Sequence, residues 1–390
     1  MTDLRILQIA PEIAPGSGVG GVAHHLEEAF ERAGVPTARF TLADARGTWL
    51  PEPGPGVRGR LVLLARVVWF STVGTVLARR RVARERRAGR GAGDAVVSIC
   101  HNDVLAGDVY VNHGILRVAM RARGGYAWRM ARNPLHLFTA ARDALRYRGR
   151  SHRVVVNLTR SERDALRSTY PRLRARAVVI GNGVDVARFA PPTPAERVAA
   201  RAAAGVPEGA VHVVFVGHEF DRKGLDLVLA AAADLPDVHV SVVGGTPDML
   251  ADVRARVARL GTTDRVHLAG RVPDPRPWLH AADALALPSA YEANALVVLE
   301  ALACGVPVVG TPVGYAPDVI EDGITGWLVD RTVEGVRTGL AAVAALDDGA
   351  RREVSARSRA TAERHDWDAV ARRYLELAAT LAAARSEHRP

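Results

Sequence analysis

LRILQIAPEIAPGSGVGGVAHHLEEAF, residues 4–30, is the stretch that decides the fold class. Its first apolar run ends at Pro11, a glycine-rich segment follows, and a run with helical periodicity begins near Val22. This order predicts a strand, a loop and a helix, which together open a doubly wound α/β domain. Gly20 and Gly21 would immediately precede the helix, where free N–H groups and the helix dipole suit a phosphate group. A plain strand-to-helix turn is the alternative for these two glycines.

The rest of the chain repeats this alternation in two series of short apolar runs separated by helical segments. Such alternation predicts parallel sheets. The chain has 390 residues, more than one hydrophobic core usually holds, so two domains are expected, with the proline-rich residues 188–196 as the hinge region. The expected strands lie at residues 37–43, 94–100, 108–113, 153–159 and 176–185 in the first series, and at 211–217, 238–245, 265–272, 282–289, 306–314 and 325–330 in the second.

Composition argues against several classes of protein. Aromatic residues make up only 5% of the chain and no RNA- or DNA-reading motif occurs, so the net charge of +10 does not predict a nucleic-acid partner. The first residues lack a basic start followed by a long apolar core, so we expect no secretory signal and a cytoplasmic protein. Cys100 and Cys304 lie in apolar segments without CxxC spacing, a pattern typical of buried reduced thiols.

Lys223 is the only lysine, so 51 of the 52 Lys and Arg residues are arginine. A drift that turned nearly every cation into arginine spared one site, which indicates that a compact ammonium is needed there; chance survival is the alternative. Arg222 and Lys223 follow the strand expected at 211–217 and precede a helix expected to begin near Leu225. Two cations at this point would neutralise a diphosphate leaving group, whereas the alternative is a solvated surface pair.

Residues 61–78, LVLLARVVWFSTVGTVLA, form a long apolar run followed directly by RRRVARERR. Arg66 inside the run, and the position of the run between expected strands, argue against a membrane span. Three interpretations remain open: a core helix with a solvated basic end, a surface helix that contacts anionic lipid, and a true span.

Two carboxylates, Glu292 and Glu300, stand in the otherwise apolar stretch PSAYEANALVVLEALACGVPVV, residues 288–309. An acid near a helix N-terminus is common and would explain Glu292, but Glu300 falls within an apolar helical run and needs a partner. A glycosidase pair requires carboxyls within about 5–10 Å, and eight helical positions rise about 12 Å. The two acids are therefore expected to bind different parts of one elongated ligand.

Three segments together resemble the retaining glycosyltransferases of family 4, which have the GT-B fold: VIGNGVDVARF at 179–189, VGHEFDRKGLD at 216–226, and the E-x7-E pattern with ALACGVPVV that follows it. Within the family, the surroundings of RKG and AYEA are most similar to the lipopolysaccharide core glucosyltransferase I type. The resemblance implies two Rossmann-like domains that face a cleft, at residues 1–186 and 187–365. A C-terminal helix at 366–385 would pack back on the first domain.

The resemblance also implies roles for residues of the second domain. Glu300 would hold the ribose hydroxyls of a nucleoside diphosphate, and Glu292 the hydroxyls of the donor sugar. Backbone N–H groups of Asn294, Ala295 and Leu296 would meet the diphosphate, and Arg271 and Val272 would border the base. Family members commonly have Glu-Gly-Phe-Gly where this chain has EANA, residues 292–295, so the donor pocket is expected to be narrower.

The first domain would receive the acceptor. His113, in VYVNHG, matches a family histidine near the anomeric carbon, with a satisfied core histidine as the alternative. His101 and Asp103 end the preceding expected strand and are expected to line the same cleft. Arg117 and Arg121 open the stretch RVAMRARGGYAWRMAR, residues 117–132, whose composition suits an anionic lipid surface or a phosphorylated glycan. A solvated basic helix is the alternative for this stretch.

The predicted reaction is transfer of a hexose from a nucleoside-diphosphate sugar to a glycan or lipid-linked acceptor with retention of configuration. No residues have metal-site spacing, so no metal or other cofactor is expected. Three alternatives stay open: a GT-B nucleotide-sugar epimerase, a non-catalytic sugar-nucleotide binding protein, and a nicotinamide dehydrogenase. The dehydrogenase would need an acidic ribose partner about twenty residues after the glycine loop, for which Asp44 is a loose candidate. Attachment to the inner face of the membrane is a further hypothesis.

Overall fold

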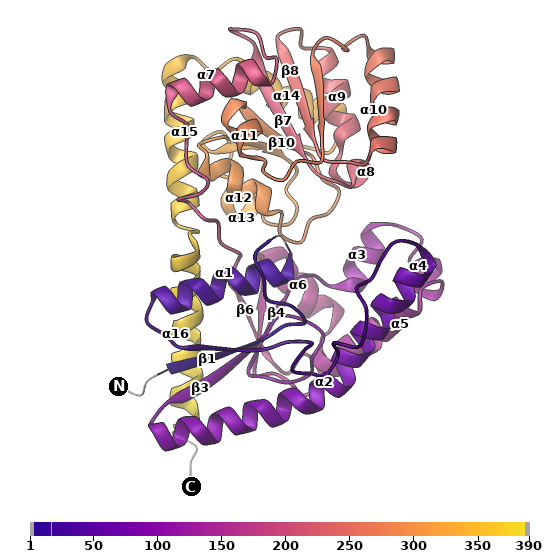
Figure 1. Ribbon diagram of the computed structural model, residues 1–390. Coiled ribbons are helices and arrows are strands. Elements are labelled where there is room, and N and C mark those ends of the chain that lie inside the picture. Colours follow the sequence, from indigo (N-terminus) through magenta and orange to yellow (C-terminus); the bar gives the residue numbers. More distant parts are fainter. Residues whose placement is uncertain (1–3, 17, 387–390) are drawn as a thin grey trace. The chain divides into compact units, whose positions relative to one another are not determined.

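The computed structural model describes residues 4–16 and 18–386, and the chain divides into two compact units. Unit 1 comprises the residues up to Asn182 together with those from Trp367 onward, and unit 2 comprises Gly183–Asp366. Each unit contains one six-stranded sheet flanked by helices (Figure 1). The proline-rich residues 188–196, expected as the hinge region, lie within unit 2.

The sheet of unit 1 has the strand order β2-β1-β3-β4-β5-β6, and neighbouring strands pair in parallel. Its strands are β1 (Leu4–Ile9), β2 (Thr37–Phe40), β3 (Ala95–Cys100), β4 (Val109–Asn112), β5 (Val154–Asn157) and β6 (Arg176–Val179). Parallel strands are buried on both faces, which explains why the sequence of β3 to β5 reads as almost continuously apolar. The helices of unit 1 are α1 (Val19–Arg32), α2 (Gly56–Ala92), α3 (Leu116–Ala122), α4 (Tyr126–Ala131), α5 (Pro134–Arg148), α6 (Arg160–Thr169) and α16 (Trp367–Ser386).

Alternate side chains of these strands enter two separate hydrophobic cores. Val109 and Val111 of β4 pack with α1 and α16, whereas Tyr110 between them packs with α2, α5 and α6. The same alternation occurs in β5, where Val155 joins the second core. This period of two is the expected geometry of a strand and makes unit 1 a three-layer structure.

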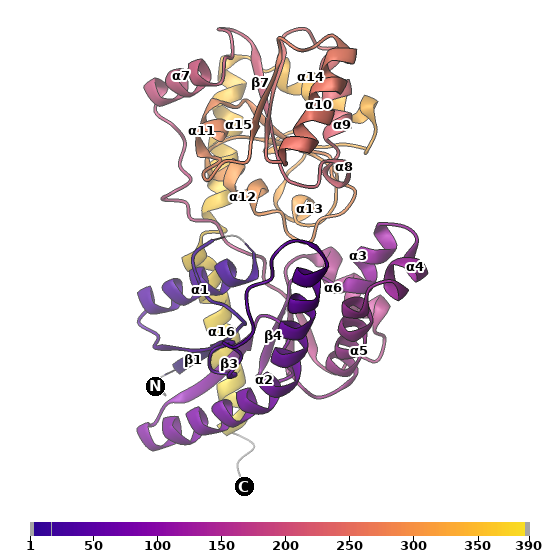
Figure 2. The same ribbon diagram turned by 45° about the vertical axis from the view of Figure 1, so that its right-hand side comes forward.

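Helix α2 spans 37 residues and covers one face of the sheet of unit 1 (Figure 2). Phe70, Ala78 and Val82 are buried in the second core, but Leu61 and Val76 are exposed. By length and composition alone, Gly56–Gly91 could cross a membrane, and 28% of its most apolar window is buried within the protein. Helix α2 therefore packs against the core of unit 1 with part of its surface and exposes the rest.

The last helix, α16, supplies the outer layer of the first core of unit 1. Tyr374 is 3% exposed, and its ring meets Phe30 of α1 edge-on at 6.4 Å. Arg153 donates to the carbonyl of Leu381 at 3.1 Å, and Arg32 pairs with Asp368 at 2.7 Å. Helix α16 thus belongs to the same unit as the first helix, α1.

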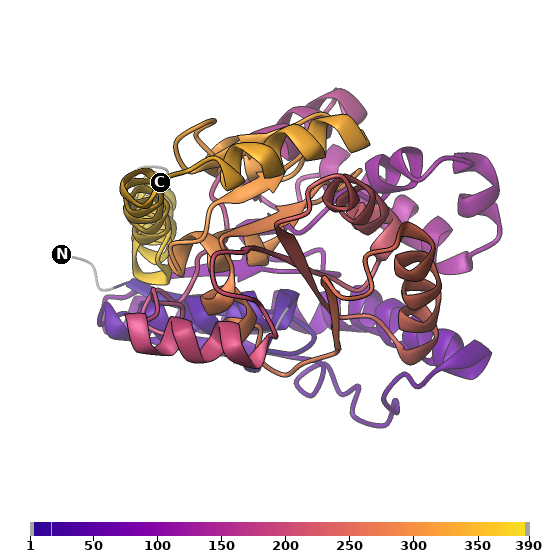
Figure 3. The same cartoon turned by 90° about the horizontal axis from the view of Figure 1, so that it is seen from above.

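The sheet of unit 2 has the strand order β12-β11-β10-β7-β8-β9, again with parallel pairing throughout. Its strands are β7 (Val211–Val216), β8 (Val238–Val243), β9 (Val266–Gly270), β10 (Ala284–Leu287), β11 (Val308–Gly310) and β12 (Gly326–Leu328). Its helices, which lie on both sides of the sheet (Figure 3), are α7 (Pro194–Ala203), α8 (Phe220–Lys223), α9 (Leu225–Ala233), α10 (Pro247–Leu260), α11 (Arg276–Ala281), α12 (Leu296–Ala303), α13 (Ala316–Val319), α14 (Val333–Ala344) and α15 (Asp348–Glu363). The sequence prediction of two parallel α/β sheets is confirmed, since each expected strand segment contains a strand.

We predict that Tyr374→Ala destabilises unit 1 by about 3–5 kcal/mol, because truncation of a buried aromatic side chain leaves a cavity. Urea unfolding followed by the fluorescence and circular dichroism of the whole chain measures this loss. Arg372→Ala, an exposed neighbour on the same helix, is the matched control and should change stability by less than about 0.5 kcal/mol. Equal unfolding midpoints for the two variants would contradict the packing of α16 described above.

Candidate active site

The candidate residues of unit 2 follow the carboxyl ends of β7, β9 and β10. In a parallel sheet these ends share one edge, and ligands of open α/β sheets bind there. Because β7 lies between β10 and β8 in the sheet, the segments after β7 and β10 are neighbours. The sheet order thus explains how residues almost seventy positions apart in the sequence come together.

Glu292 lies between the two cations that follow β7. Its Oε1 atom is 3.0 Å from Nζ of Lys223 and 3.1 Å from Nη1 of Arg222, and it accepts a hydrogen bond from Ser289 Oγ at 2.9 Å. Arg222 also donates to the carbonyl of Tyr291. The cluster is largely buried: the side-chain exposures of Glu292 and Lys223 are 11% and 14%. An anion that binds here would contact two cations that are already paired with a carboxylate of the protein, Glu292.

Two glycines allow this close approach. Gly224 ends α8 with φ +78°, and a Cβ atom there would lie 2.4 Å from the carbonyl oxygen of Pro288. A Cβ at Gly217 would lie 2.2 Å from Cδ of Lys223, so the lysine stem packs against the backbone after β7. Any larger residue at either position would push the cation segment away from Glu292.

Helix α12 begins at Leu296, directly after the loop that carries Glu292. Ala295 is its N-cap and provides no side-chain cap, so the first N–H groups of the helix remain available to a ligand. Asn294 precedes the cap and is partly buried. The three positions predicted to meet a diphosphate therefore form the start of one eight-residue helix.

Glu300 lies on α12, in its second turn, and is partly buried. Burial raises the pKa of its carboxyl to about 7, an effect that Arg188 opposes and Asp274 reinforces. Asp274 itself is held by Arg276, whose Nε donates to both carboxylate oxygens at 3.1 and 2.8 Å. The carboxyl of Glu300 is thus about half-ionised near pH 7. The nearby cation, Arg188, favours its ionised form, and the nearby acid, Asp274, disfavours it.

Arg271 and Val272 follow β9 directly, Arg271 exposed and Val272 partly buried. Sequence reasoning did not single out two other contacts at this edge. Ser289 bonds Glu292. His218 Nδ1 accepts from the N–H of Gly245 at 3.2 Å, which joins the segments after β7 and β8. The repeated glycines at 244–245, directly after a strand, were the available signal for such a close approach.

In unit 1 the glycine-rich loop differs from the prediction. Helix α1 begins at Val19, so Gly20 and Gly21 lie within its first turn and do not precede it. The physical reason is crowding: a Cβ atom at Gly21 would lie 1.8 Å from the carbonyl oxygen of Gly16, and one at Gly20 would lie 3.0 Å from that of Glu12. The N–H groups of this first turn still lack acceptors within the helix, so an anion can bind them.

His101 and His113 follow β3 and β4, and their rings are 5.8 Å apart. His101 is fully buried, and its Nε2 pairs with Gln8 Oε1 at 2.7 Å. Burial lowers the pKa of His113 to about 4, so its imidazole is neutral at pH 7. Within the described chain its Nε2 atom is buried and makes no hydrogen bond. His113 is therefore suited to exchange a hydrogen bond with a ligand hydroxyl, whereas one of the two ring nitrogens of His101 already has a protein partner.

Asp103 is buried in an ion pair with Arg142, which also contacts Asp143. Its backbone carbonyl accepts from Arg146 at 3.0 Å.

Arg117 lies over the ring of Tyr170 at 5.8 Å, and Arg121 over that of Tyr126 at 5.5 Å. Asp103 thus stabilises the interior of unit 1, and a role in acceptor binding stays a prediction for it and for both arginines.

No group of three or more His, Cys, Asp or Glu side chains that could hold a metal ion occurs among residues 4–16 and 18–386. The expectation that the reaction uses no metal stays a prediction.

Solved structures of glycosyltransferases share this architecture. Sucrose-phosphate synthase from Thermosynechococcus elongatus matches with a TM-score of 0.71 at 19% identity, over 98% of this chain and all of that one. WaaG, a glycosyltransferase involved in lipopolysaccharide biosynthesis, matches with a TM-score of 0.69 at 19% identity, over 95% of this chain and 99% of that one. HepE of Anabaena, solved with UDP-glucose, matches with a TM-score of 0.65 at 20% identity, over 96% and 99% of the two chains. The fold is GT-B, as the sequence predicted.

The sequence matches narrow the class further. Residues 210–377 match the family described as "Glycosyl transferases group 1". D-inositol 3-phosphate glycosyltransferase of Mycolicibacterium vanbaalenii is 41% identical over 216 residues, 50% of this chain and 46% of that protein. The enzyme of that name from Xylanimonas cellulosilytica is 34% identical over 232 residues, 57% and 56% of the two. The match thus spans about half the length of these relatives.

We predict that a nucleoside-diphosphate sugar binds less tightly as the pH falls from 8 to 6, by up to about tenfold, because Glu300 must be ionised to accept two ribose hydroxyls. Calorimetric titrations across this range measure the effect, and Glu300→Gln should remove it. A sugar nucleotide is the suitable ligand, since each of its phosphates has one ester and one anhydride bond and therefore no group that titrates there. A titration curve equally steep in wild type and variant would contradict the assignment.

Glu292→Gln is the matched control, because it changes a carboxylate at the same edge and should retain the pH dependence. Stability provides a second measurement. The folded pKa of Glu300 is raised from 4.5 to about 7, so the folded state binds more protons than the unfolded state within that window. Wild-type stability should therefore fall as pH rises from about 4.5 to 7, relative to Glu300→Gln.

Proposed function

We propose that the chain is a retaining glycosyltransferase that moves a hexose from a nucleoside-diphosphate sugar to a glycan or lipid-linked acceptor. The carrying observation is the cluster of Arg222, Lys223 and Glu292 beside the start of α12. It combines two cations, free helix N–H groups and a carboxylate, which are the groups that a diphosphate and an attached sugar require. Its position in the region that matches group 1 glycosyl transferases supports the proposal.

In the proposed reaction, Arg222 and Lys223 neutralise the diphosphate as its bond to the anomeric carbon breaks. The sugar passes through an oxocarbenium-like state, and the acceptor hydroxyl attacks from the face that the diphosphate leaves. A departing phosphate oxygen takes the acceptor proton, so no protein nucleophile is required. Glu292 binds sugar hydroxyls after the diphosphate replaces it as partner of the cations, and Glu300 binds the ribose.

The remaining predicted residues have supporting roles in this proposal. The N–H groups at 294–296 bind the diphosphate, and Arg271 and Val272 border the base. In unit 1, neutral His113 exchanges a hydrogen bond with a hydroxyl of the donor sugar or the acceptor, and the first turn of α1 offers N–H groups to phosphate. No metal takes part in this mechanism, because the two cations carry the charge that a metal would otherwise neutralise.

A thermal-shift panel of nucleoside-diphosphate sugars tests the donor. UDP-glucose is the first choice because HepE, which has the same fold, was solved with it. A ligand at 100 times its Kd stabilises by about 2.7 kcal/mol, which raises the melting temperature by about 5 °C or more. Mass spectrometry then identifies products with lipid-linked, glycan and inositol phosphate acceptors, the last suggested by the names of the relatives. No shift with any sugar nucleotide would refute the proposal.

A nucleotide-sugar epimerase is the second candidate, since the same diphosphate site would serve it. Incubation with the donor alone separates the two: a new sugar nucleotide indicates an epimerase, and an acceptor-dependent product indicates a transferase. A binding protein without activity would show the thermal shift but no product with either treatment.

We predict that Lys223→Ala lowers kcat by about a hundredfold or more while donor affinity changes much less, because negative charge on the diphosphate grows toward the transition state. Lys223→Arg should restore little activity, since the lysine stem packs against the backbone at Gly217 and a planar guanidinium presents its donors in a different geometry from a rotatable ammonium. Steady-state kinetics and calorimetry on both variants measure this. Equal losses of affinity and kcat, or full activity of the arginine variant, would contradict the role.

We also propose cytoplasmic localisation with peripheral attachment to anionic lipid through α2, whose exposed Val57, Leu61 and Leu63 lie on the same helix as the basic residues 79–87. The protein should sediment with anionic vesicles at low salt and less at high salt, because the Debye length shortens. Leu61→Gln should weaken this binding, and exposed Arg372→Gln should not. Absence of binding at low salt would favour a soluble acceptor.

A further inference from the structure

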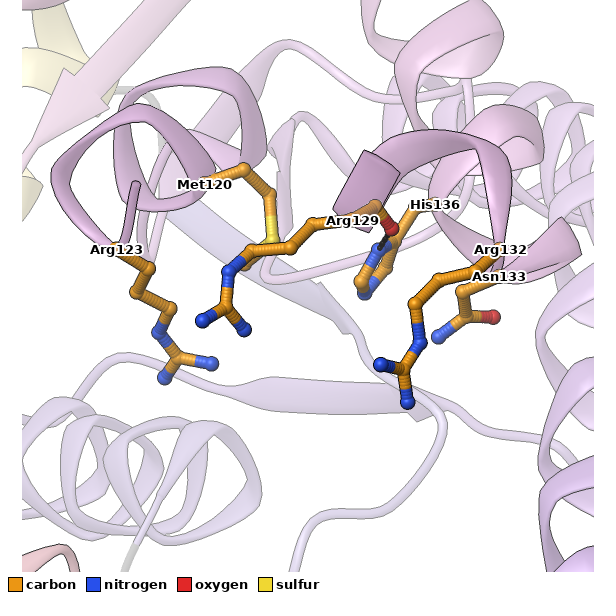
Figure 4. A pocket seen from close by; sticks show the side chains of 6 residues that line it. All are labelled: Met120, Arg123, Arg129, Arg132, Asn133 and His136. Carbon is orange, nitrogen blue, oxygen red and sulfur yellow. Dashed lines mark hydrogen bonds between the residues drawn. The ribbon is translucent and has the colours of Figure 1, made fainter. Parts of the chain in front are cut away.

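Three arginines of unit 1 surround a single cavity of about 150 Å³ (Figure 4). A cavity needs only about 10–15 Å³ of such volume for one water molecule, so this one has room for a polyatomic ligand. The guanidinium ends of Arg123, Arg129 and Arg132 point to the same side (Figure 4). Met120, Asn133 and His136 complete the lining, and none of these six described residues carries a negative charge.

The local fold explains why the three arginines converge. Helices α3 and α4 are joined by a short turn in which Gly124 and Gly125 both have positive φ, +69° and +59°. This reversal brings Arg123, before the turn, to the same cavity as Arg129 and Arg132, after it. Both glycines are in the left-handed region, where a residue with a side chain is strained.

Hydrogen bonds and stacking fix the orientation of the arginines. Nε of Arg129 donates to the carbonyl of Gly124 at 2.9 Å, which leaves its terminal nitrogens for a ligand. The guanidinium of Arg132 lies 4.2 Å from the ring centre of Trp128. His136 Nδ1 donates to the carbonyl of Arg129 at 3.0 Å, because a carbonyl can only accept. Preorganised donors of this kind lose little entropy when they bind an anion.

We propose that this cavity binds a phosphate group, and that the phosphate belongs to the acceptor of the proposed glycosyl transfer. Guanidinium groups bind phosphate oxygens in bidentate fashion, and the terminal nitrogens of Arg129 and Arg132 can donate to the oxygens of a dianionic phosphomonoester. Asn133, the N-cap of the fifteen-residue α5, also lines the cavity; its side-chain oxygen accepts from the N–H of Leu135, so its NH2 group can donate to a ligand.

The link to the acceptor rests on the proposed function and on the chain path. Helix α3 starts three residues after His113, at the carboxyl end of β4, and leads directly into the cavity. The same segment therefore carries a neutral histidine suited to a hydroxyl and a cationic cavity suited to a phosphate. An acceptor that has both groups would occupy both positions.

Calorimetric titration of the full chain with inorganic phosphate and with glucose 6-phosphate tests the cavity, with glucose as the neutral reference. We expect the phosphate compounds to bind, and Arg129→Gln and Arg132→Gln each to weaken binding at least tenfold. Arg372→Gln, an exposed arginine on α16, is the control and should bind as wild type does. Melting curves confirm that each variant is folded, and Arg129→Lys retains the charge should Arg129→Gln unfold. No binding, or binding unaffected by the cavity variants, overturns the proposal.

Vesicles distinguish a lipid headgroup from a soluble phosphate. Phosphatidate has a phosphomonoester headgroup, whereas phosphatidylglycerol has a diester with one charge. If the source is lipid, Arg132→Gln should reduce sedimentation with phosphatidate vesicles at least fivefold and leave that with phosphatidylglycerol unchanged. If the source is soluble, the variant should weaken glucose 6-phosphate binding alone. Equal effects on both lipids show general surface charge and overturn the phosphate site.

Failure of this proposal and failure of the proposed function are distinguishable. Phosphate binding is measured without donor, and the thermal shift with sugar nucleotides is measured without acceptor. If both stand, the cavity variants should raise KM for a phosphorylated acceptor at least tenfold and change kcat little. A fall in kcat with unchanged KM would assign the arginines a role other than acceptor binding.

Discussion

The contact on which the donor-side edge of unit 2 depends is that of Glu292 with Arg222 and Lys223. Partly buried cations need a counter-charge, because desolvation without one is costly. Glu292 supplies it and thereby fixes the loop before α12, which is also held by the bond from the N–H of Ala290 to the carbonyl of Arg222 at 2.8 Å. The start of α12 follows within the same loop. The ion pair therefore sets where the free N–H groups of the helix point relative to the cations.

Close backbone approach at this edge is the second constraint, and glycine is what permits it. Gly244 follows β8, and a Cβ atom there would lie 1.9 Å from the carbonyl oxygen of Gly217, while one at Gly314 would lie 2.7 Å from Cβ of Glu292. Both glycines have positive φ. The segments after four neighbouring strands are thus held against one another by close backbone contacts, which would limit the movement of the cations in the proposed exchange of Glu292 for a diphosphate.

The sequence predicted the strands and sheet type well because buried parallel strands have a local signal, a short run of apolar β-branched residues. Glu292 in a loop and Glu300 on a helix were also predictable, since the polar-to-apolar change at Ala295 is local. The start of α1 was not, because the glycine-rich segment shows no clear apolar periodicity, and the close approach of the Gly16 carbonyl to Gly21 cannot be read from the sequence. Residues 117–132 were predicted to suit an anionic partner, but the convergence of Arg123, Arg129 and Arg132 on one cavity was not predicted. A run of basic residues shows no helical periodicity. The sequence therefore does not reveal that a glycine turn folds two short helices together.

The arginine excess of the chain has several physical uses, and most do not require an anionic partner. Arg265 donates to the carbonyls of Ala232, Leu235 and Val238. Arg359 donates to the carbonyls of Val186, Phe189 and Ala303, which lie in two segments. These guanidinium groups satisfy backbone acceptors at helix and strand ends. The net charge of the chain is therefore a poor predictor of its binding partners. Cations that converge around a cavity are a better predictor of an anionic ligand.

The choice of cation at the two proposed anion sites follows from the same chemistry. A phosphate that only anchors the acceptor keeps its charge and shape throughout the reaction, so rigid bidentate guanidinium groups suit it. The diphosphate of the donor gains charge on one oxygen as its bond breaks, and a rotatable ammonium can remain in contact with that oxygen. The single lysine of the chain stands at the second site, where the demand on the cation changes during the reaction.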